Sequence, residues 1–137
     1  MAKVQLRNEI LFTAPTRIGL LAEVAEALHA AGVNITAIGA YDKGDMAEFL
    51  LLTSNNRLAG EALAPLGGQV GLIPVVVAEV ANKPGELATI ARRIANAGIN
   101  IAQIHATATD AATDAATAMI VMLTDDETKV ISLLQDV

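Results

Sequence analysis

The chain has 137 residues, of which 53% are apolar and 2% aromatic, and its formal net charge is −6. This charge argues against a nucleic-acid surface, which needs a basic stripe, and the absence of cysteine excludes disulfides and thiolate metal sites. The longest apolar runs are much shorter than the roughly 20 residues of a membrane span, and no signal-peptide pattern follows Met1. We therefore expect a cytoplasmic protein.

The first half of the chain predicts the order strand, helix, strand, strand, helix, strand. Alternating apolar residues indicate the strands, and apolar residues at i, i+3, i+4 and i+7 indicate the helices. Thr16 suits the N-cap of the first helix, and Gly32 suits its end. In chain order, the expected elements are a strand over 4–13, a helix over 17–31, strands over 33–41 and 46–53, a helix over 55–66 and a strand over 69–72.

The second half predicts the same order without the last strand. Its expected elements are a strand over 75–80, a helix between Asn82 and Gly98, strands over 99–107 and 118–124, and a helix over 126–135. The loop over 108–117 is longer than its counterpart in the first half. Since a fourth strand is missing, the second unit either has three strands or has its open edge covered by another segment.

This element order predicts an α+β fold of two ferredoxin-like βαββαβ units, each with an antiparallel sheet and both helices on one face. The first unit is expected over residues 1–72 and the second over 73–137, where it lacks its last strand. Units this small bury only about 60% of their unfolded surface and are marginally stable alone, so we expect them to share an interface.

An internal repeat supports the division into two units. A set of residues in the first half is repeated, with the same residue types, 66 positions later in the second half. The first set is Gly19, Leu21, Ala22, Ala25, Ala31, Gly32, Asn34, Ile35 and Ile38, and the second is Gly85, Leu87, Ala88, Ala91, Ala97, Gly98, Asn100, Ile101 and Ile104. Most of these positions are apolar, as any core requires. The repeated glycine and asparagine lie at the two ends of one helix in each unit, and they are the first candidates for a function.

Gly19 and Gly85 each lie in the turn before a helix. A helix N-terminus has unpaired N–H groups and a partial positive charge, which suit an anion such as a carboxylate. Glycine lets a ligand approach the backbone without meeting a Cβ atom. The structural alternative is close packing of the turn on the neighbouring strand.

Asn34 and Asn100 each begin a strand, although asparagine is depleted in strands. A side-chain amide has both donors and an acceptor, which match the ammonium and carboxylate of an amino acid. The alternative is a turn residue that bonds its own backbone.

The turn sequences Thr-Arg-Ile-Gly-Leu-Leu-Ala-Glu-Val and Asn-Lys-Pro-Gly-Glu-Leu-Ala, each followed by Ala-Gly-(Val/Ile)-Asn-Ile, resemble the signature of the ACT domain family. The resemblance covers almost the whole chain, which is similar to a stand-alone tandem ACT protein. It implies a small-molecule sensor whose units pair side by side into an eight-stranded sheet. The ligand, an amino acid, would lie between the turn of one unit and the second strand of its partner.

The resemblance assigns ligand-binding positions in both units. They are Arg17, Ile18, Gly19, Leu20, Asn34 and Ile35 in the first unit, and Lys83, Pro84, Gly85, Glu86, Asn100 and Ile101 in the second. The family often has Asp where this chain has Thr16 and Asn82, so a partner for a ligand ammonium is missing from both turns. The second turn is closer to the family pattern, because the first has Ile18 where the family has proline.

The leading hypothesis is therefore a non-enzymatic, amino-acid-binding, allosteric regulatory protein, expected as a homodimer. The alternative is a protein-interaction or oligomerisation module that binds no small molecule and acts as a regulatory subunit of a biosynthetic enzyme. We expect no catalytic residues, cofactor or metal site, because the sequence shows no nucleophile–base pair, phosphate loop or metal-ligand cluster. We also expect no nucleic-acid or membrane partner.

Overall fold

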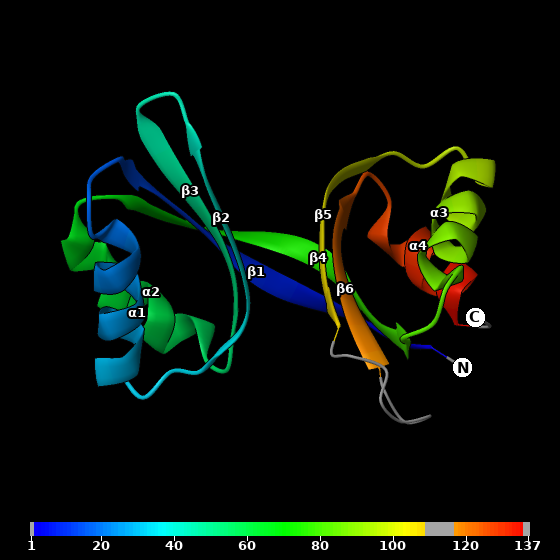
Figure 1. The fold of residues 1–137 in the computed structure, drawn as a ribbon, viewed down its shortest axis with the longest axis horizontal. Coiled ribbons are helices and arrows are strands. Elements are labelled where there is room, and N and C mark those ends of the chain that lie inside the picture. The colour runs from blue at the N-terminus through cyan, green and yellow to red at the C-terminus, as the bar shows by residue number, and fades with distance from the viewer. Residues whose placement is uncertain (1, 109–116, 136–137) are drawn as a thin grey trace. The chain divides into compact units, whose positions relative to one another are not determined.

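The computed structural model describes residues 2–108 and 117–135. Its elements follow the expected order (Figure 1). They are β1 (Lys3–Pro15), α1 (Leu20–Ala30), β2 (Ile35–Lys43), β3 (Met46–Thr53), α2 (Asn56–Leu63), the 3-10 helix η1 (Ala64–Leu66), β4 (Gln69–Ala81), α3 (Glu86–Asn96), β5 (Ile101–Ala108), β6 (Thr117–Thr124) and α4 (Glu127–Leu134). None of the helices in these residues is both long enough and apolar enough to cross a membrane.

The strands are hydrogen-bonded in the order β2-β3-β1-β4-β6-β5, and the predicted α+β fold is confirmed. Contacts between Cα atoms divide the chain into two compact units: one is residues 8–73, and the other combines residues 1–7 with residues 74–137. Compared with the expected units, 1–72 and 73–137, the main difference is that residues 1–7 group with the second unit. The long strands β1 and β4 each contribute one half to each unit.

The unit of residues 8–73 has β2, β3 and the adjoining halves of β1 and β4, with α1 and α2 on one face (Figure 1). Strand β3 pairs antiparallel with both β1 and β2. Phe12 of β1 and Phe49 of β3 pack with ring centroids 6.0 Å apart. Val24 and Leu28 of α1 lie in the same core cluster. The i, i+4 spacing of these two apolar residues thus forms the buried face of the helix.

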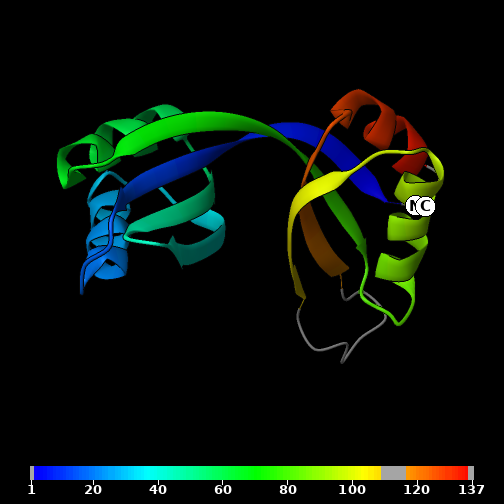
Figure 2. The ribbon, with the colours of Figure 1, turned by 90° about the horizontal axis from the view of Figure 1, so that it is seen from above.

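The second unit has an equivalent core between its sheet and helices α3 and α4 (Figure 2). Ile90 and Ile94 of α3 are buried together with Val130 and Leu134 of α4. These helices pack on alternate residues of β4 and β6, whose antiparallel register pairs Ala78 with Ile120. The hairpin of β5 and β6 follows the prediction, and most of its expected loop lies outside the described residues.

The place of the missing fourth strand is taken by the first residues of the chain. The start of β1 runs beside β4 in both views (Figures 1 and 2), and the two strands are neighbours in the sheet. Ala2 and Val4 pack against the core of the second unit. Of the two alternatives that the sequence left open, the structure therefore shows the covered edge.

The two long strands were expected to be shorter. Residues 69–72 and 75–80 were predicted as separate strands, and the structure has one strand, Gln69–Ala81, that runs through Pro74. Proline removes one backbone donor but has a φ angle that extended structure accepts. Pro74 thus does not end β4. The strand continues on both sides of the proline and contributes to both units.

Candidate functional site

Both candidate turns end in a glycine with a left-handed backbone. Gly19 has φ 88° and ψ 0°, and Gly85 has φ 92° and ψ −12°; each is the N-cap of its helix without a side-chain cap. The helices therefore begin at Leu20 and Glu86. The prediction that the first helix begins at Arg17 is wrong, because a left-handed residue cannot continue a right-handed helix.

The structural alternative for these glycines, close packing on a neighbouring strand, is also wrong. A Cβ atom built on Gly19 or Gly85 would meet no heavy atom within 4 Å. Glycine is needed here for its positive φ angle, which residues with a Cβ atom rarely adopt. The space at each glycine is left open. The first N–H group of each helix, at Leu20 and Glu86, donates to the carbonyl of Arg17 or Lys83, and neither helix N-terminus has a side-chain cap.

In the first unit this open space belongs to a pocket of about 250 Å³. Its walls come from the turn, the start of α1 and the hairpin of β2 and β3. The lining residues are Thr16, Arg17, Gly19, Leu20, Leu21, Asp42, Ala47 and Phe49. The structure thus brings together three of the predicted site residues, Arg17, Gly19 and Leu20.

Asp42 is the acidic lining residue that the predicted site did not include, since it falls between the strands expected over 33–41 and 46–53. It lies on β2 opposite Ala47 and accepts a hydrogen bond from the Thr16 hydroxyl at 3.2 Å. Next to it, Tyr41 donates a hydrogen bond to Glu48 across the hairpin, which raises the pKa of the phenol. Asp42 supplies a carboxylate beside the turn that lacks the family's aspartate. The residue 66 positions later is Ala108, so this position of the repeat has no carboxylate in the second unit.

Arg17 is held by neighbours on two sides. Its Nε donates to Glu23 Oε2 at 3.0 Å and its Nη2 donates to Glu23 Oε1 at 3.2 Å, which makes the pair bidentate. The Nη2 atom also donates to the carbonyl of Leu66 at 3.1 Å. Arg17 therefore links the turn to α1 and to the end of η1, and a ligand carboxylate would compete with Glu23 for it.

We expect this pair to make the carboxyl of Glu23 unusually acidic. The hydrogen bonds from Arg17, and to a lesser extent its charge, lower the pKa of Glu23 below its ordinary value. A lowered folded-state pKa adds stability above the unfolded pKa, and this stability is lost as the pH falls through the folded value. Carboxyl NMR titration should give a low pKa for Glu23 that returns to the ordinary value in Arg17→Gln. Arg57→Gln, which breaks a separate ion pair, should leave it unchanged; an equal change in both variants would contradict the assignment.

The second turn is organised differently. Lys83 forms an ion pair with Glu86 at 3.3 Å, three residues along the chain. Thr89 donates its hydroxyl to the Gly85 carbonyl at 3.0 Å, and Pro84 is exposed. The predicted site residues Lys83 and Glu86 thus contact each other on the two sides of Pro84 and Gly85. The Glu86 carboxylate is therefore already paired within its own turn.

The predicted asparagines lie at the other end of the helix. The Asn34 backbone N–H donates to the Ser54 hydroxyl, and the Asn34 carbonyl accepts from the Ser54 N–H. In the same way, the Asn100 N–H donates to the Asp125 carboxylate and its carbonyl accepts from the Asp125 N–H. Among the described residues, no hydrogen bond joins either side-chain amide to its own backbone. Helix α1 has 11 residues, which corresponds to about 16 Å. A single unit therefore does not bring its own turn and asparagine together.

Ile35 and Ile101 follow these asparagines and pack against the cores of their own units. Most of each side chain therefore packs within its own unit. Ile18, in contrast, is fully exposed at the tip of the first turn. Within the part of the chain that the structure describes, no three His, Asp or Glu side chains group closely enough to hold a metal ion.

Comparison with known proteins gives a family match for the second half of the chain. Residues 75–137 match the model of the ACT domain. No curated protein sequence matches the chain. A solved structure of a protein from Bacteroides thetaiotaomicron is similar over 97% of this chain and 89% of its own, with 22% identity and a TM-score of 0.85.

Two further structures are regulatory subunits of aspartate kinase. The subunit from Thermus thermophilus, in its ligand-free form, is 21% identical over 97% of this chain and 95% of its own, with a TM-score of 0.68. The subunit from Thermus flavus is 19% identical over 96% of this chain and 90% of its own, with a TM-score of 0.64. At these identities the likeness concerns the fold. The family match is therefore that of residues 75–137 to the ACT domain, and the order strand, helix, strand, strand, helix of these residues occurs also in the first half.

Proposed function

We propose that the chain is a non-enzymatic regulatory protein that binds an amino acid at an interface between ACT units. The observation that carries this proposal is the pocket at the N-terminus of α1. It has a helix N-terminus without a side-chain cap beside the open space at Gly19, and it has the carboxylate of Asp42. An amino acid has the two opposite charges that these groups would bind.

The two charges have suitable partners. The N–H groups of the first helical turn favour a carboxylate, and Asp42 favours an ammonium. The apolar lining, which includes Leu21 and Phe49, suits the body of the ligand. The pocket is small, and a partner unit would close its open side. The predicted amide of Asn34 or Asn100 would come from that partner, because it lies far from the turn in its own unit.

Exposed apolar residues support pairing with a second copy of the chain. Leu21 and Ile38 are 57% and 42% exposed, and their repeat equivalents, Leu87 and Ile104, are 51% and 44% exposed. The strands that carry the two isoleucines, β2 and β5, are the edge strands of the sheet. Edge strands with free backbone groups and exposed apolar side chains are suited to pairing, and we propose a homodimer.

A second candidate is a regulatory subunit that acts by protein contact alone. The observation in its favour is the similarity in fold to aspartate kinase regulatory subunits over nearly the whole chain. In this case the exposed edges would bind a partner enzyme, and no amino acid would change the stability of the protein.

The experiment that tests the proposal is a thermal-shift screen against the twenty amino acids, followed by calorimetric titration. A ligand at 100 times its dissociation constant adds about 2.7 kcal/mol, which raises the melting temperature by several degrees. Gly19→Asn places a side chain in the open space beside the helix, and asparagine tolerates a positive φ. We expect this variant to fold and to lose at least about tenfold in affinity.

Gly67→Asn is the matched control. Gly67 has a similar backbone, with φ 84°, and open space at its Cβ position, but it does not line the pocket. Unchanged affinity in both variants would reject the turn as the site. A flat screen with the unmodified protein would instead favour the second candidate, to be followed by a search for the partner enzyme.

A further inference from the structure

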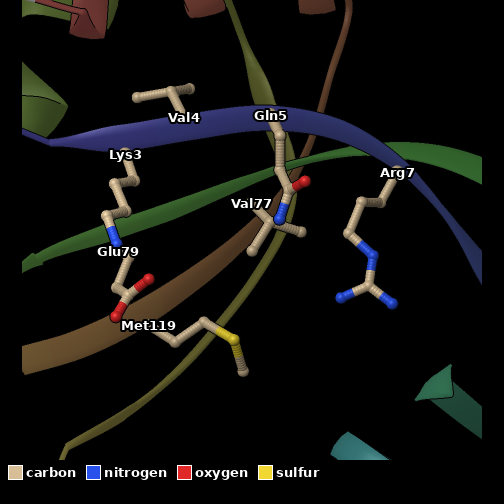
Figure 3. Close-up of a pocket in the computed structure, with 7 residues that line it drawn as sticks. All are labelled: Lys3, Val4, Gln5, Arg7, Val77, Glu79 and Met119. Carbon is tan, nitrogen blue, oxygen red and sulfur yellow. The ribbon is translucent and has the colours of Figure 1, made fainter. Parts of the chain in front are cut away.

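A second pocket, of about 450 Å³, lies on the sheet of the unit formed by residues 1–7 and 74–137. It is lined by Lys3, Val4, Gln5 and Arg7 of β1, Val77 and Glu79 of β4, and Met119 of β6 (Figure 3). The side chains of Lys3, Gln5 and Arg7 point to one side of β1, and Val4 points to the other side (Figure 3). Val4 packs against the core beneath the helices, so the pocket lies on the face that the helices leave open.

The polar groups of this pocket have opposite charges at one end. Figure 3 shows the Lys3 ammonium pointing toward Glu79. In the described part of the chain, neither of these two groups takes part in an ion pair within 4 Å. A cation and an anion that face one pocket without closing on each other can together bind the carboxylate and the ammonium of one ligand.

The remainder of the pocket would accommodate the side chain of such a ligand. Val77 is buried and Met119 is half-buried, and they provide an apolar floor from β4 and β6. Gln5 adds an amide above this floor, and the guanidinium of Arg7 lies toward the other end of the pocket (Figure 3). A cation at the end of the pocket opposite Lys3 favours a second carboxylate on the ligand. Arg7 already interacts with another group of the protein, and the ligand would share the donors of its guanidinium. The volume is within the range of small-molecule sites.

We propose that this pocket is a second binding site, for an α-amino acid with an acidic side chain. Glu79 binds the ammonium, Lys3 and Gln5 bind the main-chain carboxylate, and the side-chain carboxylate reaches toward Arg7. None of these residues lies in either turn, so the site is independent of the one proposed above. The ligand would touch residues 3–7 of β1 together with lining residues of β4 and β6, and it would therefore hold the N-terminal strand on the second unit.

Calorimetric titration of the full chain with L-glutamate and with glutarate tests this proposal. Glutarate has both carboxylates but no ammonium. We expect Glu79→Gln to weaken L-glutamate binding at least about tenfold and to change glutarate binding little. Lys3→Gln should weaken both ligands. Glu26→Gln, which removes an exposed carboxylate from α1, is the matched control and should change neither affinity.

The outcomes separate the two sites. Loss of L-glutamate binding in Glu79→Gln, together with unchanged binding in Asp42→Asn, would support the pocket on the sheet, whatever happens at the turn. Unchanged L-glutamate affinity in Glu79→Gln would overturn the proposal, and so would the absence of binding at millimolar concentration. Loss of binding only in Asp42→Asn would also overturn it, and would instead support the site at the turn.

Discussion

Replacement of Gly68 by alanine is expected to lower the free energy of unfolding by about 3 kcal/mol, because the added methyl group has no room. A Cβ atom at this position would lie 2.3 Å from the carbonyl oxygen of Thr13, 2.9 Å from Ala14 Cβ and 2.9 Å from Phe12 Cε1. The first of these atoms is backbone in the neighbouring strand, and Phe12 is fully buried. Neither can move without disturbing the core of residues 8–73. Chemical denaturation measures this change.

Gly60→Ala is the control for this substitution. Gly60 lies within α2, and a Cβ atom there would make only an ordinary contact, 3.7 Å from Val70 Cγ1. Alanine is favoured over glycine inside a helix by about 1 kcal/mol, so this variant should be more stable than the unmodified chain. A similar loss of stability in both variants would show that the close approach at Gly68 is not the cause.

The order and type of the elements were predictable because they depend on local patterns that occur twice. The apolar spacing of Val24 and Leu28 predicted the buried face of α1, and Ile90 and Ile94 repeat it in α3. Asn55 was placed at the start of α2, where its side chain accepts a hydrogen bond from the Leu58 backbone. In each of these cases the residue and the group it contacts are close in the sequence.

The helix starts were less predictable. Thr16 and Asn82 are good capping residues by type, but the caps are the glycines three residues further on in each unit. Propensity could not reveal that Thr16 instead donates its hydroxyl to Asp42, 26 residues away. The contribution of Asp42 to the pocket likewise depends on the register of the hairpin of β2 and β3, which the sequence of the turn does not determine.

The location of residues 3–7 was unpredictable for a related reason. Their alternating pattern correctly indicated a strand, but a strand pattern does not say which sheet it joins. The repeat register showed only that a fourth strand was missing after α4. The structure fills this place with a segment more than 100 residues earlier in the chain.

Removal of residues 2–7 should therefore destabilise the second unit rather than the first. The deletion exposes the edge of β4, takes Val4 from the core and breaks the hydrogen bonds between the two strands. Burial of a valine contributes about 1.5–3 kcal/mol, and each net hydrogen bond about 1 kcal/mol. We expect a loss of about 4 kcal/mol, and amide hydrogen exchange should show it mainly in β4, β6 and α3.

A pair of single substitutions distinguishes loss of this strand from a general effect of shortening the chain. Val4 packs against the core of the second unit, whereas Leu6 is 55% exposed. Val4→Ser should increase exchange in β4 and β6, because it removes apolar contacts and places a hydroxyl near the core. Leu6→Ser should change exchange little. Equal effects of the two substitutions, or a deletion that leaves exchange in β4 unchanged, would mean that residues 3–7 are not the fourth strand of this unit. The second unit would then have three strands and an open edge, which was the other alternative that its sequence allowed.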